Sequence, residues 1–161
     1  MGDTCQHDHA DGPPGKAEVE RALAAAGDRL TAEGERLTPA RLRVLALLLA
    51  AGEPVKAYDL IARFGEDGQP AKPPTVYRAL EFLERKGLAH RIASISAYVA
   101  CTSGGRDHAA AFLICDCCGA TAEVSSPVAG DLVRAADAAG YAIERTTIEA
   151  HGRCPACRGP A

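Results

Sequence analysis

Aromatic residues are scarce in this chain of 161 residues: tryptophan is absent, and Phe, Tyr and Trp together make up only 4% of the composition. Hydrophobic residues still account for 47%, so a packed core is expected, built mainly from Leu, Val, Ile and Ala. Long apolar runs are also missing, because the longest, 44–51, is far too short to cross a bilayer. We therefore expect no membrane partner. The length suits one medium domain or two small ones.

Signatures of catalysis are lacking as well. The sequence contains no HExxH pair, no phosphate-binding glycine loop and no evident Ser-His-Asp set. We therefore predict that the chain is not an enzyme and has no small-molecule substrate. We recognise no signal peptide, so we expect a cytoplasmic protein whose thiols stay reduced.

Positive charge is in deficit overall, since the net charge is −3, which is unlike a nucleic-acid binder. The charge is unevenly distributed, however. Between residues 36 and 91 there are ten Lys or Arg against six Asp or Glu, a net charge of +4. A locally basic segment can bind phosphate in a globally acidic chain, and such binding depends strongly on salt.

Two CxxC pairs are the most informative motif that is present: Cys115 with Cys118, and Cys154 with Cys157. Each pair places two thiolates on one side of a tight turn, and two such turns supply the four soft ligands of a structural Zn²⁺ site. The alternative is a pair of redox-active dithiols or disulfides. Cys117 is an extra thiol within the first pair, and we interpret it as a bystander.

Other functions compatible with these cysteines are a zinc or dithiol enzyme and a zinc-stabilised protein-interaction module. Four thiolate ligands leave no open coordination position for a reacting water, which argues against a zinc enzyme. A thiol oxidoreductase needs one accessible CxxC of low pKa rather than two converging pairs. The basic segment 36–91 argues against a module that does not bind DNA.

Helical patterns occupy the first half of the chain after a polar tail, 1–16, which holds Cys5, His7 and His9. This cluster could form a zinc site beyond the others described in this section, as a third, but a tail with incidental ligands is the favoured interpretation. Helices are predicted over 17–33, from Thr38-Pro39 to the stop at Gly52, over 56–64 and over 75–86. The second of these helices is expected to bury one stripe of leucines: Leu42, Leu45, Leu48 and Leu49.

The helix over 75–86 carries two contrasting faces. Val76, Leu80 and Leu83 share one face, whereas Tyr77 and Arg78 lie on the opposite one. This arrangement matches the second helix of a helix-turn-helix, whose early residues reach base edges.

After Gly87 the apolar residues recur with a period of two instead of the helical period. This alternation predicts two strands of a wing, 89–93 and 97–100. A hinge is expected at 101–107. Strands are then predicted over 109–114, 120–124 and 141–149, with a helix over 127–139. The predicted fold class is α+β. The predicted domains are a winged helix-turn-helix over 17–100 and a small α/β domain with a four-cysteine zinc site over 108–161.

Several motifs agree in order and spacing with one known family. The stretch AKPPTVYRALEFL, followed by GLAHRI, SISAYVAC and ICDCCGATAEV, resembles the ferric uptake regulator family and in particular its zinc-sensing branch. The ending IEAHGRCPAC is similar to that branch too. This resemblance covers about residues 37–157. It implies a homodimeric, metal-dependent repressor that binds double-stranded operator DNA with inverted-repeat symmetry, and it makes 108–161 the dimerisation domain.

The resemblance also implies the roles of particular residues. The structural zinc falls on the four CxxC cysteines, and a second, regulatory zinc falls on His90, Cys101, His108 and Glu123. Two zinc ions per protomer are therefore expected. Tyr77 and Arg78, with Thr75 and Arg41, are the expected DNA contacts. His151 is expected to support the structure rather than to bind metal. The alternative within this family is a regulator that senses iron, manganese or nickel.

Overall fold

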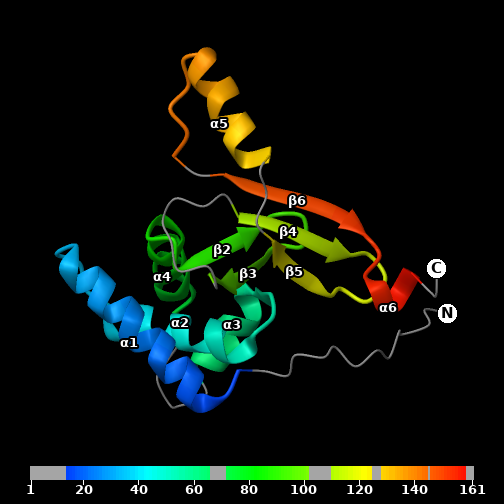
Figure 1. Ribbon diagram of the computed structural model, residues 1–161. Coiled ribbons are helices and arrows are strands. Elements are labelled where there is room, and N and C mark those ends of the chain that lie inside the picture. Colours follow the sequence, from blue (N-terminus) through cyan, green and yellow to red (C-terminus); the bar gives the residue numbers. More distant parts are fainter. Residues whose placement is uncertain (1–13, 66–71, 102–109, 125–127, 145, 159–161) are drawn as a thin grey trace. The chain divides into compact units, whose positions relative to one another are not determined.

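The computed structural model describes residues 14–65, 72–101, 110–124, 128–144 and 146–158 (Figure 1). The chain divides into two compact units. The described residues of the N-terminal unit lie within 14–101, and those of the C-terminal unit lie within 110–158. Each unit has its own three-stranded sheet. The predicted tail lies almost wholly outside the described residues, as does the hinge after Cys101, so the domain limits stay predictions. None of the described helices is both long and apolar enough to cross a membrane.

The described residues of the N-terminal unit form four helices and a small sheet. The helices are α1 (Lys16–Ala32), α2 (Pro39–Ala51), α3 (Ala57–Gly65) and α4 (Pro73–Arg85), and their order confirms the prediction. Helix α2 begins as expected: the Thr38 hydroxyl accepts a hydrogen bond from the Arg41 backbone N–H over 3.5 Å. It ends at Gly52, whose φ of +63° is a conformation that glycine adopts without strain.

The buried face of α2 differs from the predicted stripe. Leu45 and Leu48 are buried as expected, but Leu42 is 41% exposed and Val44 takes its place in the core. Since α2 is apolar on nearly every side, its sequence does not specify which face turns inward. Packing against α1 and α4 decides it.

The wing is an antiparallel sheet in the order β1-β3-β2. Strands β2 (Ala89–Ile92) and β3 (Ala97–Ala100) match the predicted pair, and the turn between them places Ser96 at a φ of +51°. Strand β1 (Val55–Lys56) was not predicted, and the helix expected from residue 56 begins at Ala57 instead. A two-residue strand carries no periodicity of its own. It exists because Val55 and Lys56 pair with Tyr98 and Ala97.

The core of the N-terminal unit is aliphatic, as the composition requires. The predicted inner face of α4 is confirmed, because Val76, Leu80 and Leu83 are all buried. Phe82 on the same helix is also buried, which the helical stripe did not predict. The other fully buried large side chains of this core are Leu30, Val44, Leu45, Leu48 and Leu60.

The C-terminal unit contains a mixed sheet in the order β5-β4-β6. Strand β4 (Ala110–Cys115) lies in the middle, antiparallel to β5 (Thr121–Val124) and parallel to β6 (Thr147–Gly152). Helix α5 (Val128–Ala138) supplies the crossover that a parallel neighbour needs. A short helix, α6 (Pro155–Arg158), follows β6. The predicted α+β class with a winged helix is confirmed.

One strand of this sheet lies later in the chain than predicted. The sequence predicted 141–149, whereas β6 begins at Thr147 and continues to Gly152. Tyr141 and Ile143 produced the misleading alternation, but both are exposed and neither pairs with another strand. The true limits follow from the partner strand, because Ala110 pairs with Thr147 and Cys115 with Gly152.

Candidate metal centres and nucleic-acid interface

Four cysteine sulfurs gather in the C-terminal unit. The two predicted pairs are Cys115 with Cys118 and Cys154 with Cys157. Their four Sγ atoms all lie within 4.8 Å of one another. The Sγ atoms of Cys118 and Cys154 are 3.7 Å apart. A disulfide would hold two sulfurs at about 2.05 Å. Four thiolates at about 2.3 Å from a central Zn²⁺ would stand roughly 3.8 Å apart. The spacing therefore fits a tetrahedral metal site rather than disulfides.

Strand pairing brings the two turns together. Cys115 ends β4 and pairs with Gly152 at the end of β6, two residues before Cys154. The backbone N–H of Asp116 also donates to the Gly152 carbonyl over 2.8 Å. We define residues 115–119 as the first knuckle and 154–158 as the second. Gly119 closes the first knuckle at a φ of +76°, and its N–H donates to the Cys115 carbonyl over 2.9 Å.

The electrostatics of the cluster are asymmetric. Hydrogen bonds from the backbone N–H groups of Cys118 and Cys154 lower the pKa of the Cys115 thiol to about 6. The second of these bonds spans 3.3 Å. Burial raises the pKa of Cys157. The fold alone thus stabilises the Cys115 thiolate, whereas ionising Cys157 calls for a cation. This donor set fits a structural zinc, which would displace the remaining thiol protons on binding.

Two further side chains, one on β6 and one in the first knuckle, lie close to the cysteine cluster in sequence. His151 on β6 contacts the first knuckle, with its Nδ1 2.8 Å from a carboxylate oxygen of Asp116. This contact ties β6 to the first knuckle, and the role predicted for His151, to support the structure rather than to bind metal, stays a prediction. Cys117 is exposed, unlike the buried Cys115, and it is not part of the four-sulfur group.

The predicted regulatory ligands are divided between the two units. His90 lies on β2, where it pairs with Val99, and Cys101 directly follows β3. The Cys101 N–H donates to the Leu88 carbonyl over 3.0 Å. A ring nitrogen of His90 and the Sγ of Cys101 lie within 4.8 Å of each other. The wing therefore brings an imidazole and a thiolate together, which is half of a zinc ligand set.

The remaining predicted ligands are placed less fully. Glu123 lies on β5 in the C-terminal unit, opposite Phe112. His108 lies outside the described residues, as do Cys5, His7 and His9 of the predicted tail. The ligand set of the regulatory zinc therefore stays a prediction.

The outer face of α4 exposes the two residues that were predicted to contact DNA bases. Tyr77 is 46% exposed and Arg78 is exposed, while Val76 and Ala79 beside them are buried. Thr75 is half-buried at the start of the same helix. Burial of one face thus fixes the orientation of the other, so that Tyr77 and Arg78 are available to a ligand such as DNA.

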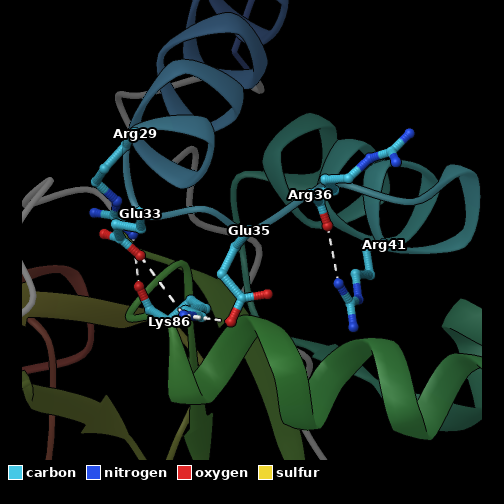
Figure 2. A network of polar contacts seen from close by, with 6 residues as sticks. All are labelled: Arg29, Glu33, Glu35, Arg36, Arg41 and Lys86. Atoms are coloured by element: carbon cyan, nitrogen blue, oxygen red, sulfur yellow. Dashed lines mark hydrogen bonds and ion pairs between the residues drawn. The ribbon is translucent and has the colours of Figure 1, made fainter.

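Arg41, also predicted to contact DNA, is held by two interactions. Its guanidinium carbon lies 3.4 Å from the centroid of the Phe82 ring, which is a cation–π contact. Its Nη1 donates to the Arg36 carbonyl over 2.8 Å (Figure 2). No sequence pattern indicated the stacking on Phe82, because the two residues lie on different helices.

Sequence reasoning also missed a polar network that joins the end of α1 to the end of α4 (Figure 2). We call it the Lys86 clasp, which consists of Lys86, Arg29, Glu33 and Glu35. The Lys86 ammonium lies 2.8 Å from Glu35 and 3.7 Å from Glu33, and Arg29 donates to the Lys86 carbonyl over 2.6 Å. The hydrogen bond between Glu35 and Lys86 holds the pKa of the Glu35 carboxyl below its usual value.

Known proteins share both the sequence and the fold. The profile of the ferric uptake regulator family matches residues 32–151. The zinc uptake regulation protein of Escherichia coli strain K12 is 40% identical over 144 residues, which cover 88% of this chain and 84% of that protein.

Two solved structures agree closely with the fold described above. A zinc uptake regulator complexed with zinc and DNA superposes with a TM-score of 0.79 at 39% identity, covering 87% of this chain and 95% of that one. The crystal structure of holo XcZur gives a TM-score of 0.75 at 38% identity, with coverages of 86% and 97%. The match to the family profile extends from the end of α1 to β6 and thus across both units. The chain belongs to the ferric uptake regulator family, and within it to the zinc uptake regulator branch.

Proposed function

We propose that this chain is a zinc-responsive, dimeric transcriptional repressor that acts in the cytoplasm. When loaded with zinc it binds operator DNA and represses genes for zinc uptake. One observation carries the proposal: a single chain combines a winged helix whose α4 exposes Tyr77 and Arg78 with a zinc-compatible thiolate cluster. The relative solved with zinc and DNA, 39% identical to this chain, supports the same combination.

The first zinc is structural in this proposal. It takes the four clustered cysteines and joins the end of β4 to the segment after β6, which lie 39 residues apart in sequence. A closed site of four thiolates has no position for an exchangeable ligand, so its contribution is to folding. It would therefore stay bound under conditions in which a regulatory ion exchanges.

The second zinc is regulatory, and we propose His90, Cys101, His108 and Glu123 as its ligands. Support comes from the wing, where the His90 ring and the Cys101 sulfur lie within 4.8 Å. A thiolate among the ligands favours zinc over manganese or other metals that prefer oxygen ligands. The four residues come from both sides of the segment that follows Cys101. Binding one ion would therefore restrict how the DNA-binding unit moves relative to the rest of the dimer.

Dimerisation is proposed through the C-terminal unit. Among the described side chains of helix α5, three large apolar ones are exposed: Val128, Leu132 and Val133. A second copy of the chain would cover apolar surface of this kind. Two copies related by a two-fold axis would present two α4 helices, which is why the proposed operator is an inverted repeat.

The test is a mobility-shift titration with a duplex that carries the inverted repeat selected by the protein from random DNA. We expect binding with Zn²⁺, loss of binding on mild chelation, and recovery when zinc is restored. Iron(II), manganese(II) and nickel(II) are the matched comparisons at equal free concentration. Binding that responds to one of these metals and not to zinc would make the chain a sensor of that metal. Binding that ignores every metal would overturn the proposal.

A further inference from the structure

A short turn, residues 86–88, connects the end of α4 to the start of β2 in the N-terminal unit. We call it the joint. Leu88 uses both of its backbone groups there: its N–H donates to the Leu83 carbonyl over 2.8 Å, and its carbonyl accepts a hydrogen bond from the Cys101 N–H over 3.0 Å. Through this one residue, α4 is hydrogen-bonded to a proposed ligand of the regulatory zinc.

Hydrogen bonds close the last turn of α4 just before the joint. The Lys86 N–H donates to the Phe82 carbonyl over 3.0 Å, and the Gly87 N–H donates to the Glu84 carbonyl over 2.9 Å. A carbonyl beyond the last helical turn has no partner within its own helix. The Lys86 carbonyl is in this position, so its partner must come from elsewhere in the fold.

Arg29 of α1 supplies that partner. Its Nη2 donates to the Lys86 carbonyl over 2.6 Å (Figure 2). Helix α1 is fixed in the core of the same unit, because Ala26 and Leu30, on either side of Arg29, are buried. A hydrogen bond from a charged donor is stronger than one between neutral groups. Arg29 therefore braces the joint from an element that belongs to neither α4 nor the wing.

We propose that Arg29, by keeping the joint rigid, transmits to α4 the restriction that regulatory zinc imposes on the wing. This inference rests on the proposed function, since it takes His90 and Cys101 as zinc ligands and α4 as the reading helix. An ion held by the wing fixes α4 only if wing and helix move as one body. Arg29 acts through the Lys86 carbonyl, so it is a positioning residue for the coupling between the two sites.

The experiment measures that coupling directly. Arg29→Met removes the donor, and Arg21→Met, an exposed side chain of the same helix, is the matched control. The affinity of the regulatory zinc is measured by competition with a chelator, with and without saturating operator duplex, and the ratio is the coupling factor. Arg29→Met should match the wild type without DNA, but its coupling factor should be smaller by about 2- to 30-fold. Arg21→Met should keep the wild-type factor.

Two further variants separate transmission from stability. Arg29→Lys keeps a cationic donor for the Lys86 carbonyl and should restore most of the coupling. Lys86→Met removes the ammonium from the clasp but leaves the backbone carbonyl that Arg29 holds. It should therefore lose thermal stability and keep the coupling factor. If Arg29→Met does not fold, Arg29→Gln must show the smaller factor.

The proposal is overturned if Arg29→Met keeps the wild-type coupling factor. It is equally overturned if Lys86→Met loses as much coupling as Arg29→Met, because coupling would then follow stability alone. Failure of the proposed function has a different result, since wild-type DNA binding would then ignore zinc. A wild-type zinc midpoint in Cys101→Ser would instead exclude Cys101 as a ligand, and neither of these two results involves Arg29.

Discussion

Within the first knuckle, Cys115, Cys117 and Cys118 lie within four residues but occupy different environments. Cys115 ends a strand, is buried and accepts backbone hydrogen bonds that stabilise its thiolate. Cys118 lies 3.7 Å from a sulfur of the second knuckle, whereas Cys117 is exposed. The CxxC spacing predicted which cysteines of the two knuckles cluster. The contact between the knuckles itself comes from the pairing of β4 with β6, which no local pattern specifies.

Cys118→Ser should therefore remove the structural zinc, and Cys117→Ser should not. Replacing one of four thiolates leaves a weaker ligand in a site whose binding energy is folding energy. We expect Cys118→Ser to lose the proposed structural zinc and the proposed dimer, and to unfold in the C-terminal unit. Metal content per protomer, sedimentation and circular dichroism provide the measurements. A stable, dimeric and metal-free Cys118→Ser protein would contradict the structural role.

Lys86 makes contacts of a kind that no sequence pattern indicates. Its ammonium is largely buried beside two glutamates that lie far before it in the sequence. Local periodicity predicts which face of α4 is buried. It carries no information about partners on another helix, and for that reason the clasp was missed. The stacking of Arg41 on Phe82 was missed on the same ground.

Lys86→Met should lower the melting temperature by a few degrees at pH 7. The ion pair lowers the folded-state pKa of Glu35. Its stabilisation is therefore present above the unfolded pKa of about 4.3 and is lost as pH falls through the lowered folded value. The difference between wild type and variant should thus shrink below about pH 4. Lys16→Met, which affects an exposed pair with Glu20, is the control and should match the wild type throughout. An unchanged difference at low pH would show that the charge of Glu35 is not involved.

At the scale of elements, predictability followed the strength of the pattern. Helix α4 has one apolar and one polar face, and its orientation was predicted, although the predicted range of 75–86 is displaced from the observed Pro73–Arg85. The position of helix α2 was predicted correctly, but its buried face was not, since Leu42 and Val44 offer similar hydrophobicity on different faces. The predicted range of strand β6 was displaced because the position of this strand depends on its register with β4. A strongly amphipathic pattern therefore predicts which way an element faces, whereas for α2 the facing and for β6 the position are decided by packing partners.

Arg78→Ala tests whether α4 reads sequence. An arginine near the start of a recognition helix can donate to both acceptors of a guanine edge. We expect the variant to lose about 1–3 kcal/mol of discrimination at one base pair in each half-site. Binding to operators substituted one position at a time measures this loss. Arg85→Ala, on the same exposed face but in the last turn, is the comparison and should keep the preference. If Arg78→Ala binds operator and random DNA as the wild type does, α4 is not the reading element.

At the scale of the molecule, the predicted chemistry requires the two units to act together. Each is compact with its own sheet, and the proposed regulatory ligands are divided between them. An ion that takes ligands from both restricts their relative motion, so DNA binding no longer includes that ordering cost. Coupling of this kind is reciprocal: DNA must tighten zinc binding by the same factor by which zinc tightens DNA binding, typically about 5- to 150-fold.

Cys101→Ser separates this switch from the fold. The variant keeps the four-cysteine cluster, so it should retain the structural zinc, the dimer and the thermal stability of the wild type. It should require more zinc to bind operator and should lose the mutual tightening, because a hydroxyl is a poor zinc ligand compared with a thiolate. Zinc titrations of wild type and variant, followed by operator binding and repeated with and without DNA, measure both midpoints. Cys117→Ser supplies the thiol control. Equal midpoints and equal maximal affinity in Cys101→Ser and wild type would place the regulatory ion elsewhere, with Cys5, His7 and His9 as the next ligands to replace.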